Sequence, residues 1–169
     1  MSHENIAIGV LVVILASILL EPLVELLNLG RENIILGTAL SNSARSARDR
    51  SLEYEFQRNL DAKVNEDKFA EYFSDAFEAA MNVTRKNPGA SNTELEFRSN
   101  DGKYNDFTVK LDFDEETDPE REQVVTKVTL EAVSDYKFKT KYLKLAAAAG
   151  EDVDYQLKEE RVLVLTITN

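Results

Sequence analysis

The chain opens with the apolar run Ile6-Ala-Ile-Gly-Val-Leu-Val-Val-Ile-Leu-Ala-Ser-Ile-Leu-Leu20, fifteen residues without a charge. A helix rises about 1.5 Å per residue, so this run covers roughly 22 Å. The apolar character continues beyond Glu21 and Pro22 as far as Leu29. Because a bilayer core needs about twenty apolar residues, the extended segment is long enough to cross a membrane.

Three interpretations of this segment compete. A cleaved signal peptide needs a positively charged start, but residues 1–5 contain no Lys or Arg. A core helix of a soluble protein would need burial on all sides, which the small acidic remainder of the chain can hardly provide. We therefore favour a retained membrane helix, with anchor residues Ile6, Val10, Val13, Leu20, Glu21 and Pro22.

The far end of the span carries two acids and a proline. Pro22 lacks an N–H and crowds the carbonyl group of Ile18, so we expect it to kink or loosen the helix. Glu21 and Glu25 are four residues apart and share one face of the helix. They lie either at the headgroup level or buried against the cation of a partner, and we favour the headgroup level.

Charge divides the chain sharply. Residues 1–30 contain none of the 20 Lys and Arg residues and three of the 31 acids, so residues 31–169 carry a formal charge of −8. The total of −11 argues against a nucleic-acid partner, which requires a basic face. The chain has no Cys and one His, His3, which excludes thiol chemistry and clusters of His ligands within one chain. We assign no catalytic residue and no cofactor, and expect a structural protein rather than an enzyme.

Residues 31 to about 62 are predicted to continue the helix. Small residues recur along it at spacings of three and four, and the packing candidates are Gly37, Ser41, Ala44 and Ala47. Small side chains allow another element to approach closely. The sequence leaves open whether that element is a filament neighbour or the chain's own sheet. Leu52, Phe56, Leu60 and Val64 then extend an apolar stripe at a spacing of four.

A second helix is predicted from Glu66 to about Val83. Asn65 is a suitable N-cap, and Phe69, Phe73 and Phe77 recur at the spacing of a core-facing helical surface.

The last part of the chain is predicted to be β-rich. Alternating apolar residues indicate strands near 93–98 and 106–113, with Asp101-Gly102 as a hairpin turn. Apolar residues indicate two further strands near 123–133 and 161–168. The segment 137–150 is ambiguous between helix and loop. The predicted fold class is α+β: a transmembrane helix that continues as a long helix, followed by an antiparallel sheet of about four strands. The expected units are a transmembrane anchor at 1–30, a helical stem at 31–87 and a β domain at 88–169.

An acidic stretch between the second and third predicted strands suggests a weak calcium site. Seven acids occur within residues 112–122, and the candidate ligands are Asp112, Asp114, Glu116 and Asp118. However, the turn glycine of an EF-hand is missing and Gln123 occupies its twelfth position. We favour a solvated hairpin loop without a metal.

The order of these elements resembles a pilin-type layout. More narrowly, Leu20-Glu-Pro-Leu-Val24 and Ala39-Leu-Ser-Asn-Ser-Ala-Arg-Ser-Ala-Arg48 are similar to the TadE-like pseudopilins of tight-adherence pili. Val128-Thr-Leu-Glu-Ala-Val133 and Tyr136-Lys-Phe138 are similar to the β-region of that family. The resemblance implies a structural subunit that associates with itself or with other pilin-like subunits.

The resemblance has two further implications. Such proteins carry a prepilin-peptidase site with a Gly or Ala five residues before a Glu, and Ala16 and Glu21 have that spacing. Cleavage there would leave little membrane span, so processing stays open. The resemblance also implies a single-pass membrane protein with an extracytoplasmic C-terminal domain. The positive-inside rule favours the opposite orientation, because Arg31, Arg45, Arg48 and Arg50 follow the span.

Two alternatives remain from the sequence. One is a membrane-tethered accessory or binding module of a secretion or conjugation apparatus, and the other is a calcium-dependent adhesin. If the small-residue face serves assembly, Ala44→Leu or Ala47→Leu is expected to block assembly while the sheet domain stays folded.

Overall fold

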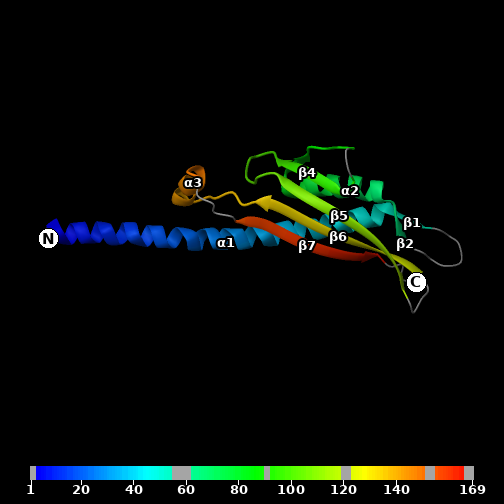
Figure 1. Cartoon of the computed structure of the whole chain (residues 1–169), viewed down its shortest axis with the longest axis horizontal. Coiled ribbons are helices and arrows are strands. Elements are labelled where there is room, and N and C mark those ends of the chain that lie inside the picture. The colour runs from blue at the N-terminus through cyan, green and yellow to red at the C-terminus, as the bar shows by residue number, and fades with distance from the viewer. Residues whose placement is uncertain (1–2, 55–61, 90–91, 119–122, 151–154, 166–169) are drawn as a thin grey trace.

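A computed structural model describes residues 3–54, 62–89, 92–118, 123–150 and 155–165. Figure 1 shows one very long helix that lies along a twisted sheet for half its length and projects beyond the sheet toward the N-terminus. This is the α+β arrangement that the sequence predicts, with the apolar helix outside the sheet domain.

Helix α1 spans His3–Ser51, and Pro22 lies inside it without interrupting it. The helix therefore continues through Pro22, and the boundary drawn at residue 30 lies within it. The first half of α1 is exposed, whereas its second half carries a buried stripe of Leu36, Ala39, Leu40, Ala44 and Ala47. The first half of α1 is thus apolar and unpacked, whereas its second half is part of the core.

The predicted continuation of this helix to residue 62 is wrong. Strand β1 (Leu52–Tyr54) follows α1 directly and pairs antiparallel with β2 (Ala62–Val64). The backbone N–H of Asn65 donates to the Ser51 carbonyl oxygen at 3.2 Å, which satisfies an acceptor at the end of α1. Phe56 and Leu60, from the expected stripe, lie outside the described residues.

Helix α2 spans Glu66–Met81, as its sequence pattern predicts. The Asn65 side chain accepts a hydrogen bond from the backbone N–H of Lys68 at 3.0 Å and caps it. The helix ends at Asn82, whose φ of 54° is left-handed, a conformation that Asn adopts more readily than most residues. The chain therefore reverses at once into β3 (Val83–Arg85), a three-residue strand that the sequence pattern does not reveal.

The main sheet is antiparallel and has five strands in the order β3-β4-β5-β6-β7, rather than about four. Its longer strands are β4 (Glu94–Ser99), β5 (Phe107–Asp118), β6 (Gln123–Asp135) and β7 (Gln156–Leu165). The β1–β2 hairpin meets the start of β6, where Ala62 lies opposite Val125. Helix α3 (Lys141–Ala148) occupies the ambiguous segment between β6 and β7.

The core lies between the helices and one face of the sheet. The Phe69 and Phe113 rings meet edge to face with centroids 5.5 Å apart, and Phe77 lies 5.0 Å from Phe97 and 6.1 Å from Phe107. The opposite face of the sheet carries charged side chains, among them the Lys158–Glu131 ion pair. This face of the sheet is not covered by a helix in the described part of the chain, so it faces the surroundings.

Candidate functional site

The first half of α1 is the most distinctive surface of the molecule. Residues 5–24 are exposed apart from the half-buried Glu21, and this stretch includes Leu11, Val13 and Leu19. Twenty helical residues cover about 30 Å, which equals the thickness of a bilayer core. Among the described residues, α1 is the one helix long and apolar enough to cross a membrane, and a signal sequence would satisfy the same criteria.

The exposed run ends at a buried carboxylate. The Glu25 side chain is fully buried, and its Oε2 atom accepts a hydrogen bond from the Tyr136 hydroxyl group at 2.7 Å. Its Oε1 atom accepts from the backbone N–H groups of Lys139 at 2.6 Å and Thr140 at 2.5 Å. A buried carboxylate that accepts several hydrogen bonds is well satisfied. These three hydrogen bonds to Glu25 therefore connect the segment between β6 and α3 to helix α1.

A second carboxylate reinforces this connection two turns further along α1. Glu32 is buried and forms an ion pair with the half-exposed ammonium group of Lys139. Burial raises the pKa of Tyr136, and so does its hydrogen bond to Glu25, so its hydroxyl group stays protonated as a donor. The segment 136–140 is thus held to α1 by side-chain and backbone groups together.

A polar cavity of about 200 Å³ adjoins this connection. Its lining residues come from α1, the β4–β5 turn and the segment before α3, and they are Asn28, Arg31, Glu32, Ile35, Lys103 and Lys139. A hydrogen bond with Tyr104 chiefly raises the pKa of Lys103, and the charges of Glu32 and Asp101 raise it further. The cavity therefore gathers three cations around one buried acid.

The predicted position of Glu25 at the headgroup level stays a prediction, but its environment is now defined. Its carboxylate is buried and is enclosed by groups from the same chain. Glu21 lies one turn earlier and is half-buried.

The small residues of α1 pack against the chain's own sheet domain. Gly37 is buried, and a Cβ atom there would meet the guanidinium group of Arg161 and the carboxylate of Glu159 on β7. Ala44 and Ala47 belong to the hydrophobic core, and Ser41 is half-buried beside them. Of the two alternatives that the sequence left open, the structure shows the contact with the domain itself.

The candidate calcium ligands lie along a strand and not in a loop. Asp112, Asp114 and Glu116 occupy alternate positions of β5 on its exposed face, where they pair with Thr129, Lys127 and Val125 of β6. The side chain of Asp118 lies outside the described residues. Within the described part of the chain, no group of three or more acidic or His side chains is placed to hold a metal ion.

No family model, curated protein or solved structure matches this chain.

Sequence reasoning missed the partners of Glu25. Tyr136, Lys139 and Thr140 lie 111 to 115 residues away from it. The sequence offered one signal, an acidic residue within an apolar segment. That signal did not indicate which distant residues would form hydrogen bonds with Glu25.

Proposed function

We propose that this protein is a single-pass, membrane-anchored structural subunit of a pilus-type or pseudopilus-type assembly. The continuity of α1 carries the proposal. Its first twenty exposed residues match a bilayer core, and the same helix then supplies the core of the sheet domain. Because the helix is unbroken, an anchor in the membrane would hold the domain in a fixed orientation above the surface.

The layout supports the pilin-like interpretation within this proposal. A long N-terminal helix that is free in its first half and packed on an antiparallel sheet in its second half suits the TadE-like resemblance (Figure 1). The interior side chains of Ala44 and Ala47 are already used within the domain. Contact between subunits therefore falls to the exposed half of α1, where Gly9 has open space beside Val10 and Val13.

Cysteine cross-linking in membranes tests assembly directly, because the natural chain has no Cys. Single variants Val10→Cys and Val13→Cys are expected to give ladders of covalent oligomers on oxidation. Lys110→Cys, on the exposed face of β5, is the matched control and is expected to stay monomeric. Monomers from all three variants would favour the alternative, a membrane-tethered accessory or binding module.

We further propose that the sheet domain is extracytoplasmic. A membrane-impermeant maleimide added to intact cells is expected to label Lys110→Cys. Labelling only after the cells are broken would place the domain in the cytoplasm, as the four arginines after the span favour.

A further inference from the structure

The position of α3 is fixed relative to the anchor. The backbone N–H groups of Lys139 and Thr140 donate to Glu25, the first residue after the exposed run. Helix α3 begins at the next residue, Lys141. Figure 1 shows α3 beside α1, at the end of the sheet nearest the projecting apolar helix. If residues 5–24 fill the bilayer core, α3 must lie at the level of the lipid headgroups.

Basic side chains gather at this same level. We name them the basic collar, and its members are Arg31, Lys103, Lys137, Lys139, Lys141 and Lys144, all of them exposed. Three line the cavity beside Glu32, and the Lys137 ammonium group donates to the Gly102 carbonyl oxygen at 2.5 Å, next to Lys103. Residues 136–150 contain four lysines and no acid. The acids Glu151, Asp152 and Asp154 follow and lie outside the described residues.

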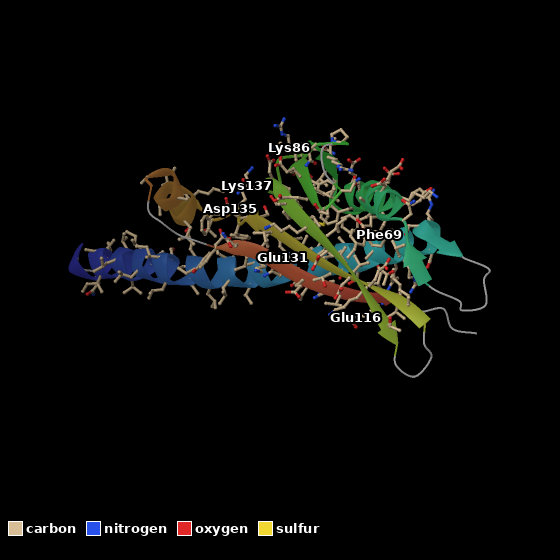
Figure 2. The ribbon with its side chains drawn as sticks, turned by 45° about the vertical axis from the view of Figure 1, so that its right-hand side comes forward. Phe69, Lys86, Glu116, Glu131, Asp135 and Lys137 are labelled. Atoms are coloured by element: carbon tan, nitrogen blue, oxygen red, sulfur yellow. The ribbon has the colours of Figure 1, made fainter. Side chains whose placement is uncertain are left out.

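Three of the acids near the collar are engaged within the chain, whereas a fourth, Asp135, is exposed two residues before Lys137 (Figure 2). Glu25 is buried under its three hydrogen bonds, and Glu32 pairs with Lys139. Asp101 accepts hydrogen bonds from the Ser99 hydroxyl group and the Lys103 backbone N–H. The six cations of the collar outnumber these four acids, in a chain whose net charge is −11.

Negative charge is concentrated at the opposite end of the sheet. Asp112, Asp114, Glu115 and Glu116 are exposed along the distal part of β5, and Asp118 lies opposite Gln123 at its end. Glu120 and Glu122 lie outside the described residues. Lys137 follows the other end of β6. Figure 2 shows Lys137 and Glu116 at opposite ends of the sheet. The acids that an anionic surface would repel are thus held far from the level of the bilayer.

Helix α3 also has the composition of a helix that lies in a membrane interface. Leu143 packs against the protein core, whereas Leu145 is exposed and Lys141 and Lys144 extend into the surroundings. Lysines together with an exposed leucine suit a surface where headgroups meet acyl chains. We infer that α3 and the basic collar form a second membrane contact that binds anionic lipid headgroups. This inference rests on the proposed membrane anchoring.

The test uses the full chain reconstituted as single copies in lipid nanodiscs that contain phosphatidylcholine and 30% phosphatidylglycerol. Spin-labelled forms of the two lipids report the relative affinity of the protein for the anionic lipid. We expect a severalfold preference at low salt that falls toward one in 0.5 M NaCl, because each basic residue near an anionic surface contributes about fivefold. Single copies exclude contacts of α3 with a second subunit.

Two triple variants that each remove three positive charges distinguish an effect of the collar from an effect of the net charge. The triple variant Lys103→Gln, Lys141→Gln, Lys144→Gln is expected to lose the preference for phosphatidylglycerol. The control triple variant Lys68→Gln, Arg98→Gln, Lys110→Gln changes exposed cations outside the collar and is expected to keep it. Equal behaviour of the two variants would overturn the inference.

A site-specific probe completes the test. A fluorophore on Leu145→Cys, the only cysteine of that variant, is expected to be quenched by brominated lipids in the nanodisc. A protein that stays in the disc with a water-exposed probe would overturn the α3 contact but leave anchoring intact. A protein that does not stay in the disc would refute the anchoring itself.

Discussion

Glu25 is the residue on which the junction between anchor and domain depends. It lies near the end of the apolar segment that is predicted to cross the membrane, and it is fully buried by groups from the other half of the chain. The sequence predicts where this carboxylate lies along the helix. Its burial arises from tertiary contacts that no local pattern encodes.

Glu25→Ala is expected to destabilise the junction strongly. The substitution leaves the Tyr136 hydroxyl group and the N–H groups of Lys139 and Thr140 without their acceptor, at a cost of about 2–4 kcal/mol. Hydrogen exchange at the amides of residues 139 and 140 measures the free energy of local opening. Glu71→Ala, at an exposed position of α2, is the control and should leave both amides protected. Equal exchange in both variants would show that the junction does not depend on Glu25.

Tyr136 gives the junction a dependence on alkaline pH. Burial and the hydrogen bond to Glu25 raise its pKa above the ordinary value of 10.0, so the unfolded chain loses this proton first as the pH rises. The contribution of the protonated Tyr136 to the free energy of unfolding is fully present below pH 10. Above pH 10 this contribution falls by about 1.4 kcal/mol per pH unit. Urea unfolding of the wild type and of Tyr136→Phe at pH 9 to 11 measures this slope. A slope of the same size in the Phe variant would exclude Tyr136 as its cause.

At the scale of elements, α1 serves as an anchor in its first half and as a core helix in its second. The small residues in the second half allow β7 and α2 to pack closely against α1. At Gly37, for example, the guanidinium group of Arg161 occupies the space that a Cβ atom would need. The expectation that leucine at Ala44 or Ala47 would block assembly and spare the fold needs revision, because both side chains lie inside the core.

Ala44→Leu and Ala47→Leu are each expected to destabilise the sheet domain. Three added carbon atoms must fit into an interior that is already filled, at a cost of about 1–3 kcal/mol. Ser46→Leu, on the exposed side of the same helix, is the matched control and should change stability little. Urea unfolding followed by circular dichroism compares the three variants. An unchanged midpoint for the two alanine variants would contradict the observed packing.

Strongly periodic elements were predictable, whereas elements set by tertiary contacts were not. The Phe69, Phe73 and Phe77 spacing predicted α2, and alternation or apolar content predicted the four longer strands, although β7 begins at Gln156 and not near residue 161. Strand β3 has three residues, too few to show alternation, and it depends on the left-handed Asn82. Strand β5 extends through the acidic stretch because β6 pairs with it residue by residue and its acids face outward.

At the scale of the whole molecule, the apolar anchor, the basic side chains and the acidic side chains follow one another along the direction of α1. The helix has 49 residues, about 73 Å, of which the first part is exposed and apolar and the second part belongs to the domain. Basic side chains surround the transition and acidic ones lie at the far end of the sheet. The charge balance of the sequence indicated an anchored acidic protein, but the segregation of its charges follows from the folding of the β5–β6 hairpin.

Two side chains of α1 test the central claim most directly. Leu19 and Ile34 are almost equally exposed in the structure, at 76% and 71%, but lie on opposite sides of Glu25. Single variants Leu19→Cys and Ile34→Cys are treated with a water-soluble maleimide in opened membrane vesicles. A membrane anchor predicts that position 34 is labelled at once and position 19 only after denaturation. Equally rapid labelling of both positions, or a mature chain that has lost residue 19, would contradict it.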